Sequence, residues 1–193
     1  LVEAGQVSAG SILNWLSQTV FGLDENGHAD LMDEAARRAA GGSGLLTLDY
    51  FMGNRTPYRD VDLRGAVLGL SLGHDRADIY ASAVDSIALG SANVVDVLRQ
   101  RGVRTERIVM AGGICKNPLW LQASVDALGT PVNVARDDNL SGVGAAICSA
   151  TALGLFPDLV ATARACAAPT RAVEPDPARS TWYAEAIGSY REA

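Results

Sequence analysis

The sequence has 193 residues, of which 48% are hydrophobic and 20% are charged, a composition typical of one ordinary folded domain with a real core. The net charge of −6 offers no basic surface for a polyanion, so we expect no nucleic-acid partner. The three cysteines are far apart and odd in number, which argues against a disulfide framework and fits a reducing cytoplasm; no apolar run reaches the roughly 18 residues of a membrane span, so we expect no membrane partner.

The first half of the chain alternates helical and extended patterns, separated by glycine-rich turns. Apolar residues recur at helical spacing in three segments, the last of which is long, amphipathic and followed by Gly102. Short β-branched or alternating runs predict the strands. The predicted helices span residues 8–21, 31–40 and 78–101, and the predicted strands span residues 45–51 and 65–72.

The second half alternates strands and helices more regularly, which implies an α/β layer with parallel strands. The predicted strands are 107–111 and 131–135, and the predicted helices are 118–128, 142–155, 159–167 and 180–192. Between the last two helices, Pro169, Pro175 and Pro177 predict an extended stretch across the surface.

A glycine pair follows the strand at 107–111 and stands directly before a helix. Gly112 and Gly113 allow a ligand to approach the backbone, Asn117 is a good helix N-cap, and Pro118 suits the first helical turn. Free amides at a helix start attract anions, so a nucleotide phosphate or ribose is a natural ligand. The local pattern is equally consistent with a tight turn and a simple cap, and both interpretations remain open.

Several motifs in this order resemble the FGGY carbohydrate kinases, members of the actin-like ATPase superfamily. Residues 112–122, read with the later segment 142–146, are similar to the ATP-binding core of that family. Upstream, residues 65–70 followed by 78–85 are similar to its second signature, and residues 3–15 are similar to the family segment beside the nucleotide. The motifs occur in the order and at the spacing of the family.

The resemblance implies an α/β fold of the actin-like ATPase (ribonuclease H-like) type, a mixed sheet flanked by helices. Residues 1–156 would form the FGGY-type C-terminal nucleotide-binding domain, and residues 157–193 a helical tail of the same domain. The resemblance also implies that the first strands of this domain and a sugar-binding N-terminal domain precede Leu1, which would leave a sheet edge unpaired in these residues alone. The start at Leu1, without a signal peptide, suggests a processed, truncated or dissected chain.

Five residues of the sequence match nucleotide-side positions of the family. The resemblance implies that Gly113 places its backbone against the phosphates, that Gly112 provides the close approach before it, and that Asn117 lies beside the adenosine. It further implies that Gly10 and Asn14 lie near the nucleotide, although Asn14 is shorter than the glutamine of some relatives. Polarity of a helix surface explains Asn14 equally well.

Other polar residues are tempting candidates for chemistry, but a structural role is the simpler interpretation for each. Asp78 and Asp85 belong to a matched signature on a helix, where carboxylates more often support packing. His74 stands in a polar loop, and Cys115 matches no catalytic thiol of the family. Arg55 can bind a phosphate or pin its loop to the partner domain, of which the structural role is the simpler.

The resemblance implies transfer of the ATP γ-phosphate to a hydroxyl of a sugar or polyol, with Mg²⁺ across the phosphates. Residues 48–57 look most like the ribulokinase-type members, which points to a pentulose or pentitol such as ribulose. The catalytic aspartate of the family is expected upstream of Leu1, so we assign no catalytic residue and no metal ligand here. A homodimer is compatible with the resemblance.

Two other functions were weighed against the kinase. The first is a non-catalytic, nucleotide-binding regulatory module of the actin-like superfamily. The second is a dinucleotide-binding loop around Gly112, which fails because the sequence has no G-x-G-x-x-G pattern and no acidic residue at the end of a second strand about 20 residues on.

Overall fold

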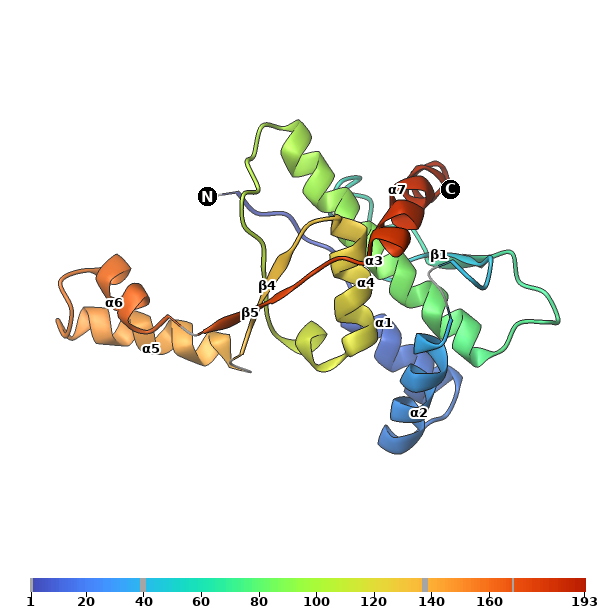
Figure 1. Ribbon diagram of the computed structural model, residues 1–193, viewed down its shortest axis with the longest axis horizontal. Helices are drawn as coiled ribbons and strands as arrows, with labels where there is room; N and C mark the ends of the chain where they lie inside the picture. The colour runs from blue at the N-terminus through green and yellow to red at the C-terminus, as the bar shows by residue number, and fades with distance from the viewer. Residues whose placement is uncertain (1, 39–40, 137–138, 168) are drawn as a thin grey trace.

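The computed structural model describes residues 2–38, 41–136, 139–167 and 169–193 (Figure 1). In chain order the elements are α1 (Ala9–Asn14), the π-helical segment η1 (Trp15–Val20), α2 (Glu25–Ala36), β1 (Leu46–Leu48), β2 (Ala66–Leu68), α3 (Arg76–Gln100), β3 (Val109–Met110), the 3-10 turn η2 (Gly113–Lys116), α4 (Pro118–Leu128), β4 (Val132–Ala135), α5 (Leu140–Ala152), α6 (Leu159–Ala165), β5 (Thr170–Val173) and α7 (Pro177–Glu192).

Helix α3 is the centre of the fold, and α2, α4, α7 and β1 pack around it (Figure 1). It begins with a capping box, in which the Asp75 side chain accepts from the backbone N–H of Asp78 and the Asp78 side chain accepts from the N–H of Asp75. Fourteen of its residues, between Ala77 and Asn93, are buried. Small side chains dominate this stretch, which lets the neighbouring helices approach α3 closely.

The strands form two small sheets rather than one parallel layer. β1 pairs antiparallel with β2, β3 pairs parallel with β4, and β5 pairs antiparallel with β4, with Val132 opposite Val173 and Ala135 opposite Thr170. The expected parallel arrangement is therefore correct only for β3 and β4. The second sheet is mixed, as expected, because the chain comes back after α5 and α6 as β5, which runs antiparallel to β4.

Two elements differ from the sequence prediction. Helix α2 starts at Glu25, well before the predicted residue 31, because the Asp24 side chain caps it by accepting from the Gly27 N–H at 2.8 Å. It ends at Ala36, and residues 39 and 40 of the predicted helix lie outside the described residues. Strand β5 was not predicted as a strand: it lies in the stretch that the prolines predict to be extended, and it pairs with β4.

Helix α7 is attached to the core through two buried tyrosines. The Tyr183 hydroxyl donates to Asp85 Oδ1 at 2.5 Å, and the Tyr190 hydroxyl donates to Asp49 Oδ1. Burial raises the pKa of both carboxyl groups, although the tyrosine hydrogen bonds act in the opposite direction. The chain's last helix therefore belongs to the packed body around α3.

The α5–α6 arm, residues 140–165, projects from the body on the far side of β4 and β5 (Figure 1). The Thr151 hydroxyl donates to Thr162 Oγ1 at 2.8 Å and joins the two helices. No described residue of α5 is buried, and its sequence carries no charged side chain. The apolar side chains of α5 are thus exposed or half-buried, and none of them is packed in a core.

Among the described residues, one helix, α3, is long and apolar enough to cross a membrane by length and composition alone, and 67% of its apolar window is buried inside the protein. The expectation that no segment reaches this length is corrected for α3. Its central residues are small and apolar because they face other helices, and a core helix passes the same test.

Candidate functional site

The glycine pair forms an exposed loop between β3 and α4. Gly112 has φ 84° and ψ −151°, a backbone conformation that side chains disfavour strongly. Gly113 opens the turn η2, and no atom lies within 4 Å of the place where a Cβ would stand on either glycine. The backbone of this loop is therefore open to a molecule that approaches from outside.

Asn117 caps α4, as the sequence predicted. Its Oδ1 accepts from the Trp120 N–H at 3.0 Å, and Pro118 fills the first helical position. Because proline has no N–H and the Trp120 N–H is already bonded, the start of α4 offers fewer free donors to an anion than the sequence suggested. The open backbone of the glycine pair is the more accessible part of this connection.

The other end of the Asn117 amide makes a buried contact that the sequence analysis missed. Asn117 Nδ2 donates to the Tyr80 hydroxyl at 3.2 Å, and Tyr80 Oη lies 2.9 Å from His28 Nε2. Tyr80 is fully buried in α3, and this burial raises its pKa to about 12. Tyr80 lies inside a matched signature, whereas nothing in the polar sequence around His28 indicated a partner on another helix.

Helix α1 lies beside the start of α4 (Figure 1). A Cβ built on Gly10 would be 3.4 Å from the Trp120 ring, so Gly10 is close to the turn that Asn117 caps. Asn14 follows one helical turn later and is exposed, while Ile12 and Leu13 between them are buried. The structure therefore brings Gly10 near Asn117 and leaves Asn14 on the solvent face of α1.

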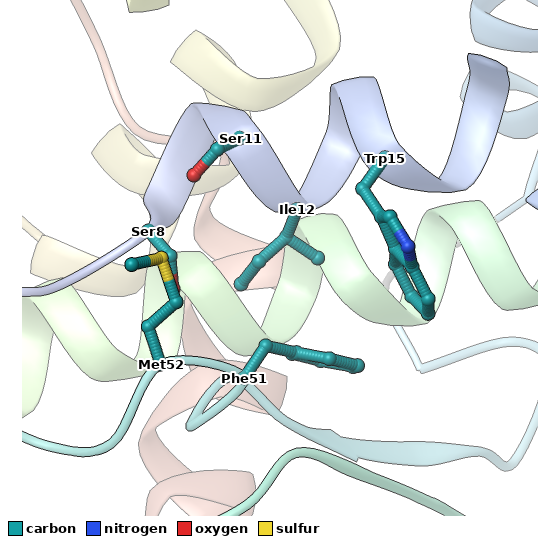
Figure 2. Close-up of a pocket in the computed structure, with 6 residues that line it drawn as sticks. All are labelled: Ser8, Ser11, Ile12, Trp15, Phe51 and Met52. Atoms are coloured by element: carbon teal, nitrogen blue, oxygen red, sulfur yellow. The ribbon is translucent and has the colours of Figure 1, made fainter. Parts of the chain in front are cut away.

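A shallow hollow of about 240 Å³ lies along another side of α1. Figure 2 shows Ile12 on α1 and Trp15 at the start of η1 on one side of the hollow, with Phe51 and Met52 opposite them and Ser8 and Ser11 completing the lining. The Trp15 and Phe51 ring centroids are 5.4 Å apart. The lining is mostly apolar and carries no charged group, so it does not suit a polyphosphate.

The remaining polar candidates form hydrogen bonds or ion pairs that support the fold. Asp78 completes the capping box and lies 3.0 Å from Arg38 Nε. Asp85 accepts from the Gly41 N–H and from Tyr183, and His74 Nδ1 accepts from the Ser71 N–H inside its own loop. Within the described ranges, no three His, Cys, Asp or Glu side chains gather into a group that could hold a metal ion.

Arg55 forms an ion pair with Glu3, with Nη2 and Oε1 2.8 Å apart on the surface. This contact joins the loop after β1 to the start of the chain, as does the bond from the Gly5 N–H to Thr56 Oγ1 at 3.2 Å. Arg55 therefore makes a structural contact within this chain, whereas the sequence pointed to a phosphate or to the partner domain.

Comparison with known proteins gives these features a family context. Residues 1–153 match the family described as "FGGY family of carbohydrate kinases, C-terminal domain". A ribulokinase of Mycolicibacterium smegmatis is 32% identical over 98% of this chain, and a xylulose kinase of Staphylococcus epidermidis is 31% identical over 78% of it. The chain spans 36% of the ribulokinase and 30% of the xylulose kinase.

Solved structures agree with the sequence match. The crystal structure of a xylulose kinase from Rhodospirillum rubrum superposes on 95% of this chain with a TM-score of 0.80 and 30% identity, and the match covers 37% of that kinase. The predicted fold class, an actin-like ATPase domain with a mixed sheet flanked by helices, is thereby confirmed. The motifs, the fold and the family match agree, and the chain belongs to the FGGY family of carbohydrate kinases as a C-terminal domain of that family.

Proposed function

We propose that this chain forms the ATP-binding side of an ATP-dependent carbohydrate kinase. The observation that carries the proposal is the open backbone at Gly113. A side chain at this position would meet no neighbouring atom, so packing within the protein does not explain the glycine. Other glycines such as Gly188 are equally open, so the support comes from the place of Gly113, in the loop between β3 and the capped start of α4, where a nucleotide phosphate would accept hydrogen bonds from the backbone.

The proposed nucleotide would contact two parts of the chain. The glycine pair would face the phosphates, and Asn117 would lie beside the adenosine at the start of α4. Gly10 supports this arrangement because it contacts the Trp120 ring on the first turn of α4, and Asn14 is exposed one turn along the same helix. ATP would thus lie across the surface between α1 and the loop.

The chemistry proposed for the whole protein is transfer of the ATP γ-phosphate to a sugar hydroxyl. This reaction depends mainly on alignment of donor and acceptor and on charge stabilisation, with Mg²⁺ neutralising the phosphates. This chain would hold and orient the nucleotide. The aspartate that accepts the hydroxyl proton, the protein groups that position Mg²⁺ and most of the sugar pocket would come from an N-terminal domain of the same protein.

A pentulose or pentitol, such as ribulose, is the proposed acceptor. The similar proteins are named ribulokinase and xylulose kinase, and residues 48–57 look most like the ribulokinase type. Because these relatives carry the names of sugar kinases, a non-catalytic nucleotide-binding module is not favoured.

Three further assignments accompany this function. We propose that residues 157–193 complete the domain formed by residues 1–156, which is supported by the pairing of β5 with β4 and by the packing of α7 on α3 and α4. A cytoplasmic location is consistent with a metabolic kinase. A homodimer remains a prediction, which light scattering on the purified protein would check.

The function is tested by a phosphorylation assay on the full-length protein with ribulose, xylulose and ribitol, and with glycerol for comparison. We expect activity with one of the pentose-derived acceptors. We also expect Gly113→Val to raise the KM for ATP about tenfold or more, because the new side chain occupies the space of a phosphate. Gly188→Val is the matched control, since Gly188 on α7 also has no atom within 4 Å of a built Cβ. No phosphorylation of any of these acceptors, or equal KM values in both variants, would contradict the proposal.

A further inference from the structure

Three helices meet behind the glycine loop at one hydrogen-bonded group, in which Asn117 and Tyr80 are buried and His28 is half-buried. Asn117 at the start of α4 bonds to Tyr80 on α3, and Tyr80 lies within hydrogen-bond distance of His28 on α2. We propose that Tyr80 and His28 are positioning residues of the nucleotide site, which act by holding the Asn117 amide in one orientation. This inference rests on the proposed function, because it concerns the same site.

The direction of each hydrogen bond follows from the helix cap. Asn117 Oδ1 accepts from the Trp120 N–H, so the other end of the amide, Nδ2, is the donor toward Tyr80. The Tyr80 oxygen accepts this bond, and its own proton is then directed to His28 Nε2. We therefore assign His28 as the acceptor through Nε2, which is the tautomer with the ring proton on Nδ1.

Because Tyr80 and Asn117 are buried, neither can easily exchange its hydrogen-bond partner. Tyr80 is 0% exposed and Asn117 is 9% exposed, so water does not readily replace a lost partner. The Tyr80 ring also packs edge-on against the His28 ring, with centroids 5.7 Å apart. Loss of the Tyr80 hydroxyl would leave a buried Asn117 Nδ2 without an acceptor and favour rotation of the amide, which competes with the cap on α4.

Movement of Asn117 would be transmitted to the loop and to α1. The Asn117 N–H donates to the Ile114 carbonyl at 3.2 Å, which ties it to the turn that Gly113 opens. The Asn117 side chain fixes the Trp120 backbone, and the Trp120 ring lies close to Gly10, 3.4 Å from a Cβ built there. Tyr80 and His28 therefore act on both parts of the proposed nucleotide surface without touching the nucleotide.

The test compares two hydroxyl deletions on α3 in the full-length protein. Tyr80→Phe removes the bond to Asn117, whereas Ser82→Ala removes a buried bond to Thr47 Oγ1 at 2.7 Å, away from the loop. We expect Tyr80→Phe to weaken ADP binding in calorimetry and to raise the KM for ATP, each about tenfold, with kcat and the sugar KM within about twofold of wild type. Ser82→Ala should lower the melting temperature without changing either nucleotide constant.

A second pair of variants tests His28. His28→Gln retains an acceptor and should keep ADP binding close to wild type, whereas His28→Leu should weaken it in the direction of Tyr80→Phe. Wild-type ADP binding with equal affinities in Tyr80→Phe and Ser82→Ala would overturn the positioning role and leave the proposed function intact. Absence of ADP binding in the folded wild-type protein would overturn both.

Discussion

The body around α3 and the α5–α6 arm differ sharply in how far their apolar side chains are buried. Fourteen residues of α3 are buried, while no described residue of α5 is, although α5 has no charged side chain. Beyond α5, the arm exposes large apolar residues, among them Leu153, Leu155, Leu159 and Val160. Figure 1 shows the same contrast, with helices surrounding α3 and the arm standing apart.

This difference teaches where stability and the proposed site are located. The elements of the candidate nucleotide surface, α1, η2 and α4, rest on the body, and buried polar groups such as Asn117 and Tyr80 hold them there. In the chain, the arm lies between β4 and β5, which pair with each other at the edge of this body. Mutations should therefore act very differently in the two regions.

The largest difference is expected between the same substitution in each region. Leu128→Ala on α4 removes a side chain that is 8% exposed and packs in a cluster with Val132, whereas Leu155→Ala removes one that is 67% exposed. We expect Leu128→Ala to lower the free energy of unfolding by about 2–5 kcal/mol and Leu155→Ala by about 0.5 kcal/mol or less. Chemical unfolding curves measure both. A large effect at Leu155 would mean that further protein covers the arm.

Two glycine-to-alanine substitutions, at Gly90 and Gly188, test how tightly the polar groups of the body are packed. A Cβ on Gly90 would lie 2.5 Å from Gln6 Nε2 and 2.9 Å from Asp49 Oδ2, so Gly90→Ala should separate this hydrogen-bonded pair and cost about 2–4 kcal/mol. Gly188→Ala on α7 meets no neighbour and should be neutral or stabilise by up to about 1 kcal/mol. Calorimetric unfolding checks the pair, and equal melting temperatures would refute the crowding at Gly90.

The attachment of α7 gives a smaller effect. Tyr183→Phe removes the hydroxyl that donates to Asp85 and leaves a buried carboxyl group with one partner fewer, so we expect a loss of about 1–3 kcal/mol. Thr181→Ala, on the exposed side of the same helix, should change the free energy of unfolding by about 0.5 kcal/mol or less. If both variants unfold alike, the buried tyrosine does not attach α7 in the way described.

The smallest expected effect is on the pH dependence of stability. Burial raises the pKa of Asp49 above the usual value of an aspartate, so the folded state binds this proton more tightly than the unfolded state. The contribution is present at low pH and is lost as pH rises through the folded-state pKa, with a slope of at most about 1.4 kcal/mol per pH unit. Asp49→Asn should remove this slope from unfolding curves recorded at a series of pH values above 4. An unchanged slope in the variant would exclude Asp49 as its source.

The sequence predicted much of the body because local signals there agree with the tertiary structure. Helix α4 has the predicted bounds, since Asn117 and Pro118 start it and Gly129, with φ 60°, ends it. The start of α2 was missed because its first turn consists of Gly27 and polar residues, with no apolar residue to show helical spacing, and only the Asp24 cap marks it. Strand β5 was missed because its partner, β4, lies more than 30 residues earlier in the chain.

The candidate site likewise combines features that the sequence could predict with contacts that it could not. The glycine pair and the cap are local patterns, so the sequence located them. The contacts of Asn117 with Tyr80 and of Tyr80 with His28 join residues that are 37 and 52 positions apart, and no local pattern reports such a pair. The proximity of Gly10 to Trp120 likewise depends on how α1 packs beside α4. The resemblance indicated which residues belong together, and the packing supplies how they are held.

Hydrogen–deuterium exchange of the full-length protein with and without ADP tests most directly whether the loop and α1 form the nucleotide surface. We expect ADP to slow amide exchange in peptides that cover residues 8–14 and 112–120, and to leave residues 159–165 of the arm unchanged. Binding of ADP with no protection of the glycine loop, or with protection confined to the arm, would contradict the account.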